Sequence, residues 1–219
     1  MPGPPRTHLV GVVSDTHVGD VLPALPQGVL DALQGVELII HAGDVTVGGV
    51  LRRLAEIAPV VAVRGNHDRA MRQPLPDAAV VRVGEVRIGV CHGHRPARYE
   101  VPMVLGGLLV GRPTVPGLRR ALLRRTGPVD CVVFGHFHMR YARRRRGVLM
   151  FSPGGAYAFD ADPSRRVRGL RGRAFARYRR RLAPDRGRPS VAILEITGRR
   201  IAYRWLDVPG PLRAPHRPA

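Results

Sequence analysis

Short polar blocks containing histidine or aspartate interrupt the apolar runs of this 219-residue chain at five places. Each block follows a run rich in Val, Ile or Leu, so each lies where a β-strand should end. The blocks are residues 14–17, 43–44, 65–68, 92–94 and 135–138. Together they offer carboxylate, amide and imidazole groups, which are common ligands of divalent metal ions. This inventory predicts a two-metal hydrolytic site.

Spacing within the blocks indicates which side chains could share an ion. Asp15 and His17 lie two residues apart, and at the end of a strand both can turn toward one metal. His136 and His138 repeat that spacing. Asp44 should end the next strand, which makes it the candidate for a carboxylate shared by two ions.

Three further residues complete the predicted site. Asn66 offers an amide oxygen and His92 another ring nitrogen. His67 follows Asn66 directly and cannot readily face the same ion, so we expect it to act as a general acid or a phosphate contact. Two ions about 3.5–4 Å apart activate water and neutralise phosphoryl oxygens, so phosphoester hydrolysis is the predicted reaction. Imidazole with carboxylate suits Mn, Fe, Ni, Co or Zn better than Ca or Mg, and we expect Mn first.

Each block alone also has a structural interpretation. Asp-x-His and Gly-Asp are common at strand ends, and Gly-Asn-His-Asp is typical of a turn. His41, two residues before Gly43, could support the site, although a hydrogen-bonded strand-end histidine is the favoured interpretation. The metal hypothesis depends on all the blocks occurring together, each after an apolar run.

Alternating strands and helices should position the first three blocks. We expect strands at 9–15, 36–44 and 60–64 and helices at 26–35 and 47–58. The second half predicts hairpins at 79–91 and 190–208, strands at 129–134 and 147–151, and a Gly- and Pro-broken stretch at 102–125 that becomes helical near 118–125. This order predicts an α/β fold, a four-layer α/β/β/α sandwich of two packed mixed β-sheets flanked by helices.

Composition raises the question of an anionic partner. The net charge is +20, and all 36 basic residues are Arg. Clustered Arg binds phosphate, but coding bias in a GC-rich genome would also replace Lys by Arg. The run 143–146 fits a solvated edge or hairpin tip, with an anion-binding patch as the alternative. Cys91 and Cys131 lie in apolar runs and are expected to be buried free thiols.

The chain is expected to form one domain, residues 8–208. Within it, 162–188 contains eleven Arg and few apolar residues and is expected to be an exposed insertion, while the Pro-rich 209–219 is expected to be a disordered tail. No apolar run approaches the ~20 residues of a membrane helix, and the N-terminus lacks a secretory pattern. We therefore expect a cytoplasmic protein with no membrane partner, and leave a homo-oligomer open.

The ordered set Asp-x-His, Gly-Asp, Gly-Asn-His-Asp, His-Gly-His and Gly-His-x-His resembles the calcineurin-like metallophosphoesterase superfamily. Block distances, compact size and residues 152–155 resemble its small YfcE-like phosphodiesterase branch. The similarity covers about 9–155 and the hairpin 190–208.

The resemblance implies a role for each block. One metal would be held by Asp15, His17 and His138, with Asp44 as the bridge. The second would be held by Asn66, His92 and His136. His67 would protonate the leaving group or bind phosphate, Asp68 would orient His67, and His94 would support the ligands. A small or nucleotide-like phosphodiester would be cleaved by a metal-bound hydroxide.

The chain departs from that family pattern in two places. Ser152 stands where the branch usually has Asn, and 162–188 has no counterpart in a minimal member. Two alternatives to a small-molecule phosphodiesterase stay open: a nucleic-acid-directed phosphoesterase or binder that uses the Arg-rich insertion, and a non-catalytic scaffold like a related eukaryotic trafficking subunit. That subunit type tends to lose catalytic groups, which this chain has kept.

Overall fold

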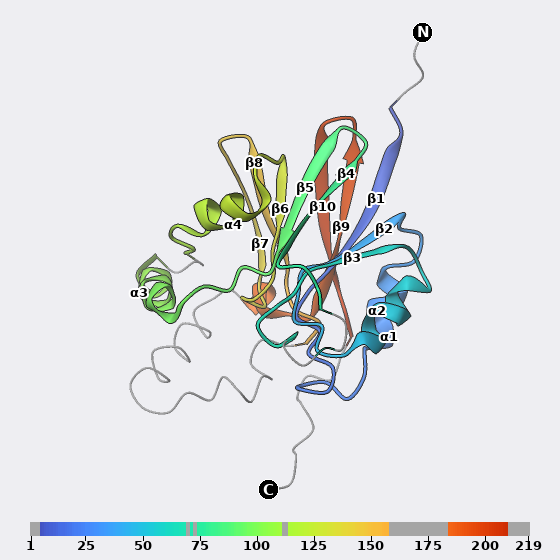
Figure 1. Cartoon of the computed structure of the whole chain (residues 1–219), viewed down its shortest axis with the longest axis horizontal. Coiled ribbons are helices and arrows are strands. Elements are labelled where there is room, and N and C mark those ends of the chain that lie inside the picture. The colour runs from blue at the N-terminus through green and yellow to red at the C-terminus, as the bar shows by residue number, and fades with distance from the viewer. Residues whose placement is uncertain (1–4, 69–70, 72–73, 111–113, 158–183, 210–219) are drawn as a thin grey trace, which may run out of the picture.

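The computed structural model describes residues 5–68, 71, 74–110, 114–157 and 184–209 (Figure 1). In chain order the elements are β1 (Thr7–Val13), α1 (Gln27–Ala32), β2 (Leu38–His41), α2 (Gly48–Ala55), β3 (Val60–Ala62), β4 (Ala78–Val83), β5 (Val86–Cys91), α3 (Glu100–Val110), α4 (Leu118–Thr126), β6 (Cys131–Val133), β7 (Arg140–Arg145), β8 (Val148–Pro153), β9 (Ser190–Thr197) and β10 (Arg200–Asp207). Short 3₁₀ turns occur at Ala97–Tyr99 and Pro184–Gly187.

Within the described residues, ten strands form two five-stranded mixed sheets. The first has the order β10-β9-β1-β2-β3 and the second β4-β5-β6-β8-β7. In the first, β1, β2 and β3 are parallel, with Val13 level with His41 and His41 level with Ala62. In the second, β5, β6 and β8 are parallel. Because parallel strands end at the same edge of a sheet, the segments that follow them are brought together.

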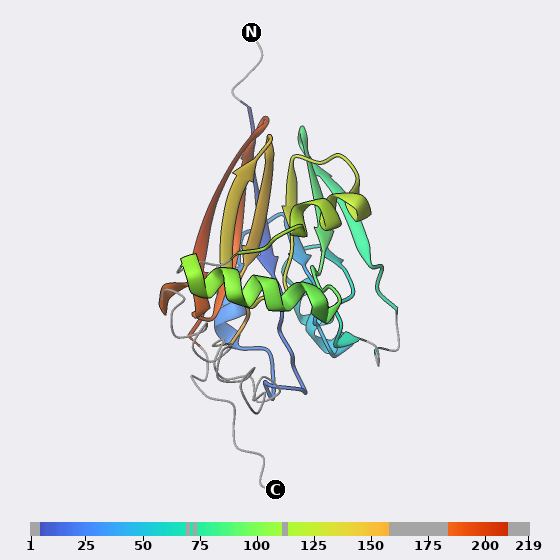
Figure 2. The same cartoon turned by 90° about the vertical axis from the view of Figure 1, so that its left-hand side faces the viewer.

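The sheets pack face to face, with α1 and α2 on one side and α3 and α4 on the other (Figures 1 and 2). Side chains alternate between the layers, as strand geometry requires. Val12 faces the core between the sheets, whereas Val13 packs in the cluster with α1 and α2. Val133 and Val132 divide in the same way between the central core and the α4 side. The predicted four-layer sandwich is confirmed.

Most predicted elements are confirmed within a few residues of their ends, but α3 was not anticipated. Residues 102–110 were expected to be broken by Gly and Pro, whereas Glu100–Val110 is helical. Pro102 lies in the first turn, where a helix needs no amide donor from it. Gly106 lies where a Cβ would come 2.8 Å from Thr114 Oγ1, so its lack of a side chain permits that contact.

The run 143–146 belongs to β7 and its turn into β8. Arg140–Arg145 pairs antiparallel with β8 at the edge of the second sheet, and charged edge strands resist pairing with other chains. The interpretation as an edge and hairpin tip is therefore confirmed. Cys91 and Cys131 are buried free thiols, as expected, and burial raises the pKa of each to about 12.

Two predicted segments fall largely outside the described residues. Of the Arg-rich 162–188, only 184–188 is described, and the tail is described only at Pro209. Within the part of the chain that is described, no helix has both the length and the apolar character needed to cross a membrane.

Candidate metal centre

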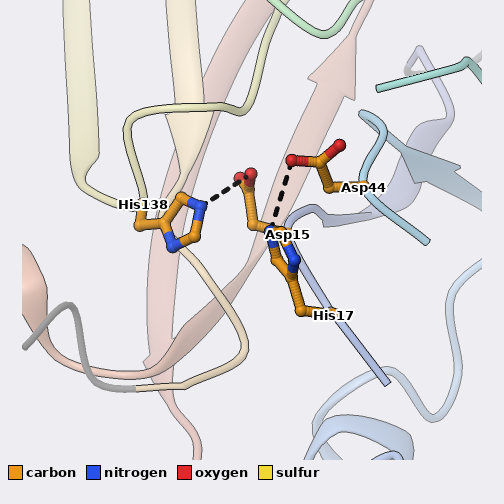
Figure 3. A group of neighbouring side chains, drawn as sticks. All are labelled: Asp15, His17, Asp44 and His138. Carbon is orange, nitrogen blue, oxygen red and sulfur yellow. Dashed lines mark ion pairs between the residues drawn. The ribbon is translucent and has the colours of Figure 1, made fainter. Parts of the chain in front are cut away.

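Four of the predicted ligands converge where parallel strands of both sheets end. Asp15 and His17 follow β1, Asp44 follows β2, and His138 follows β6. One ligand atom from each lies within 4.8 Å of the others, and all four side chains are buried. Figure 3 shows Asp15 and His17 from the segment after β1 beside Asp44 and His138 from two other segments. These are the residues that the family resemblance implied for one metal and its bridge, and the structure brings them together.

Asp44 is the residue that joins the two predicted ligand groups. Its Oδ2 lies 3.2 Å from His17 Nε2 and 3.1 Å from His92 Nε2. Its other oxygen accepts a hydrogen bond from the His67 backbone N–H at 2.8 Å. Ligand atoms at about 2.0–2.2 Å from an ion lie roughly 3.4 Å from each other in a tetrahedral site. The contacts around Asp44 therefore match the separations that a shared metal ligand would have.

Asp15 occupies the opposite side of the cluster. Its Oδ1 lies 3.2 Å from His138 Nε2 and 4.0 Å from His92 Nε2. The His136 backbone N–H donates to the carboxylate at 3.0 Å, and the Ser14 hydroxyl donates to it at 2.7 Å. These bonds hold a carboxylate that has no solvent exposure.

Electrostatics keep both aspartates ionised. Burial raises the pKa of Asp15, but His138 and His92 outweigh it and hold that pKa well below its usual range. Burial opposes ionisation of Asp44 too, and its hydrogen bonds to His17 and His92 lower its pKa. Conversely, burial alone would lower the pKa of His92, but Asp44 beside it raises that pKa to about 9. Positive charge therefore accumulates where two buried carboxylates meet, which is what bound cations would supply.

The remaining predicted ligands adjoin this cluster. His92 Nδ1 lies 2.8 Å from the Ala42 carbonyl oxygen, and donation there leaves Nε2 free to bind a metal. The His136 ring centroid lies 5.3 Å from that of His92. Asn66 Oδ1 is buried and has no hydrogen-bond partner among the described residues. A buried carbonyl oxygen without a donor is costly and fits a metal ligand.

Backbone strain is concentrated in this cluster. Among non-glycine residues, φ is +53° at Asp15, +44° at His17, +56° at Asp44, +72° at His136 and +51° at His138. Asp and His tolerate this left-handed region better than most residues, but it still costs about 1–3 kcal/mol at each position. Strain at so many polar strand ends points to a function that requires their geometry.

Glycine permits the strand ends to approach one another. A Cβ on Gly65 would lie 2.0 Å from Asp44 Oδ1, and one on Gly135 would lie 2.7 Å from Asp15 Oδ2. At Gly43, where φ is +93°, a Cβ would come 2.6 Å from His92 Nδ1. The glycine of each Gly-Asp, Gly-Asn and Gly-His block therefore makes room for a ligand from another block.

His67 lies at the edge of the cluster, with 37% of its side chain exposed. Its ring centroid is 4.6 Å from that of His17, and its Nδ1 is 3.1 Å from Asp20 Oδ2. Asp68, which the family resemblance assigned to His67, instead accepts backbone N–H bonds from Asp44, Thr46 and Gly65 at 2.7–2.9 Å. The carboxylate that contacts the His67 ring is that of Asp20.

Asp20 and Tyr157 were missed by the sequence reasoning. Asp20 lies three residues after His17, a spacing that could have drawn attention to it. No sequence feature pointed to Tyr157, because it lies outside all five polar blocks and has no ligand spacing to any of them. Its buried ring packs edge-on against the His17 and His138 rings, at centroid distances of 5.6 and 5.1 Å, and so limits their rotation.

His41 and His94 differ in their surroundings. His41 is buried, with Nε2 3.2 Å from Thr16 Oγ1, and its Nδ1 accepts the Gly43 N–H at 3.2 Å. Burial lowers its pKa to about 4, so it is a neutral, hydrogen-bonded strand-end histidine. His94 is half-buried, its ring centroid lies 5.7 Å from that of His92, and burial lowers its pKa to about 4.

Comparison with known proteins identifies the family of this chain. The family model for the calcineurin-like phosphoesterase superfamily domain matches residues 9–167. The chain belongs to this superfamily. A probable metallophosphoesterase of Methanocaldococcus jannaschii is 36% identical over 148 residues, which cover 68% of this chain and 68% of that protein. A phosphodiesterase of the same organism is 23% identical over 159 residues, covering 66% of this chain and 82% of that protein.

Solved structures support the fold. The structure of Vacuolar Protein Sorting 29 from Cryptosporidium parvum superposes with a TM-score of 0.62 at 21% identity, covering 92% of this chain and 98% of that one. The resemblance to calcineurin-like metallophosphoesterases is thus confirmed at the level of the superfamily. This chain is a metallophosphoesterase-family protein with a buried cluster suited to divalent metals.

Proposed function

We propose that this protein is a phosphodiesterase that depends on two divalent metal ions. The observation that carries the proposal is Asp44, whose Oδ2 lies 3.1–3.2 Å from imidazole nitrogens of both predicted ligand groups. A carboxylate held between two sets of nitrogen ligands suits a bridge between two ions. His17 and Asp44 also have positive φ, which supports a catalytic rather than a merely structural cluster.

The proposed ligand sets are those that the family resemblance implies, and the clustering of Asp15, His17, Asp44 and His138 supports them. Asp15, His17 and His138 would hold one ion, and Asn66, His92 and His136 would hold the other, with Asp44 shared. Mn is the ion we propose first, because a mixed imidazole and carboxylate set suits it. When bound, the pair would activate water and neutralise phosphoryl oxygens.

His67 is the proposed proton donor to the leaving group. It borders the His17 ring, yet its side chain keeps enough exposure to meet a substrate. Asp20 Oδ2, 3.1 Å from His67 Nδ1, would accept a hydrogen bond from Nδ1–H and so orient the ring with Nε2–H toward the substrate. An imidazole oriented by a carboxylate is a common arrangement for general acid–base catalysis. Asp20 therefore replaces Asp68 as the proposed positioning residue.

We propose a diester rather than a monoester as the substrate because the relative at 23% identity is named a phosphodiesterase. The alkoxide or aryloxide that leaves from either kind of ester could take its proton from His67. Because the ligand set is complete, we favour catalysis over a scaffold function.

Hydrolysis of a generic aryl phosphodiester by metal-loaded protein tests the proposal. We expect turnover with Mn²⁺ that chelation abolishes and metal addition restores, and slower turnover of the matching monoester. Tyr203→Phe, a change on an exposed strand of the first sheet, serves as the matched control and should leave the rate unchanged. No turnover of either ester with Mn, Ni, Co or Zn would overturn the proposal, and faster turnover of the monoester would overturn the preference.

A further inference from the structure

A second polar feature lies on the outer face of the second sheet, the face that does not pack against the first sheet. It is between α4 and the β7–β8 hairpin. It is a groove of about 1070 Å³ with fifteen lining residues. Six of them are arginines: Arg119, Arg120, Arg124, Arg143, Arg145 and Arg146. Three of these come from α4 and three from the hairpin, so cationic side chains flank the groove from two elements.

The charge of this groove exceeds what the composition explains. Arg makes up six of the fifteen lining residues but 36 of the 219 in the chain, and no acidic residue of the described ranges lines the groove. Elsewhere arginines pair with carboxylates, as Arg64 does with Asp77 and Arg199 with Asp130. Across the described ranges, no ion pair is recorded for any of the six. Coding bias can explain why Arg replaces Lys, but it does not explain why acidic residues are missing from the described lining of this groove.

The interior of the groove provides both a hydrogen-bond donor and an apolar surface. Arg119 lines the groove, and its Nε has no acceptor among the described residues, so no protein oxygen engages this donor of the guanidinium. Leu123, Met150 and half-buried Tyr141 also line the groove. Cationic walls around an apolar and aromatic floor match a ligand with charged and flat apolar parts.

The groove is linked to the candidate metal centre through the chain. Arg95 directly follows the 92–94 block, and its Nη1 donates to the Pro116 carbonyl oxygen at 2.6 Å. Pro116 lines the groove. The segment that carries His92 is therefore tied to the groove's rim.

We infer that this groove binds single-stranded nucleic acid. Phosphates would contact the arginines on both walls, and bases would contact Tyr141 and the apolar floor, as in other single-strand binders. A volume of about 1070 Å³ is at or above the range of small-ligand pockets, roughly 300–1,000 Å³, which favours an extended ligand. A duplex stacks its bases inside and would leave the floor unused. This binding does not require the proposed hydrolysis.

Fluorescence anisotropy with a labelled thymidine oligonucleotide of about 12 nucleotides tests the inference. Chelator is present throughout, so that binding is measured without turnover. The groove variant R120Q/R124Q/R143Q/R145Q removes four exposed charges, and the control variant R6Q/R52Q/R53Q/R200Q removes four exposed charges from the first-sheet side. Each lost phosphate contact should lower the salt slope of binding by about 0.7. We expect the groove variant to bind at least ~10-fold more weakly at moderate salt and the control to bind almost normally.

Three results would overturn the inference. The first is equal loss of affinity in both variants, which would mean that only net charge matters. The second is tighter groove-dependent binding of the matching duplex. The third is equally tight groove-dependent binding of poly-glutamate, which would indicate an acidic protein partner. Asp44→Asn should still bind the oligonucleotide, so failure of the phosphodiesterase proposal would remain distinguishable from failure of this one.

Discussion

The metal cluster and the arginine groove use charge in opposite ways. In the cluster, Asp15 and Asp44 are buried against imidazoles, at strand ends with positive φ. In the groove, five of the six arginines are exposed, on a regular helix and an edge hairpin. A strained, buried constellation has few alternative arrangements, so each member should be indispensable. Exposed charges in excess can replace one another, so each should matter little.

The largest effect should come from Asp15→Asn. Asp15 is buried against His138 and accepts the His136 backbone N–H, so loss of its charge should remove the first metal and with it several kcal/mol of transition-state stabilisation. We expect phosphodiester turnover to fall roughly 10³-fold or more. Steady-state kinetics at saturating Mn²⁺ measure this. Asp31→Asn, on exposed α1, is the matched control. A fall of less than about tenfold would contradict indispensability.

A smaller effect should distinguish Asp20 from Asp68. His67→Gln should lower kcat about 10²-fold, the lower range for loss of a general acid, with metal content unchanged. Asp20→Asn should lower kcat less and leave KM and metal content unchanged, because Asp20 acts by orienting His67. Asp68→Asn should instead lower the free energy of unfolding by about 1–3 kcal/mol, because the Asp68 carboxylate accepts hydrogen bonds from three backbone N–H groups. An unchanged kcat in Asp20→Asn would argue against the positioning role.

Metal binding by metal-free protein should strengthen as pH rises. Burial opposes protonation of His92, but Asp44 raises its pKa to about 9, so a metal must displace a proton at neutral pH. Apparent affinity should rise up to about tenfold per pH unit below that pKa. The raised pKa of His92 also stabilises the folded, metal-free protein at pH values below 6.5, the ordinary pKa of histidine. That contribution to the free energy of unfolding is lost as the pH rises through about 9. Calorimetric Mn²⁺ titrations across this range measure the affinity, and a pH-independent affinity would refute the expectation.

The smallest effect should come from one groove arginine. Arg124→Gln should weaken oligonucleotide binding only about two- to fivefold and lower the salt slope by about 0.7, since five other arginines remain. Arg53→Gln on α2 is the matched control. A 100-fold loss of oligonucleotide affinity from this single change would indicate one dominant contact. It would contradict the expected difference between the groove and the metal cluster.

The sequence predicted the chemistry of the cluster because parallel strand ends converge by topology. Asp15 and Asp44 follow neighbouring parallel strands of the first sheet, so the predicted β-α-β order was enough to bring them together. His138 follows β6 of the second sheet, and only the family resemblance placed it with them. Asp20 could not be assigned in this way, because its contact with His67 depends on the path of a loop. The sequence also did not predict α3, because Pro102 and Gly106 indicated that a helix would be interrupted there. The groove needs α4 and the hairpin in their folded positions, and only the run 143–146 gave a hint of it.

Metal stoichiometry tests the central claim most directly. Elemental analysis of protein equilibrated with Mn²⁺ should give two ions per chain for the wild type and less than one for Asp44→Asn, since Asp44 contacts imidazoles of both ligand groups. Circular dichroism should confirm that the variant remains folded. A wild-type protein that binds no ion, or a folded Asp44→Asn variant that still binds two, would contradict a dinuclear centre shared through Asp44.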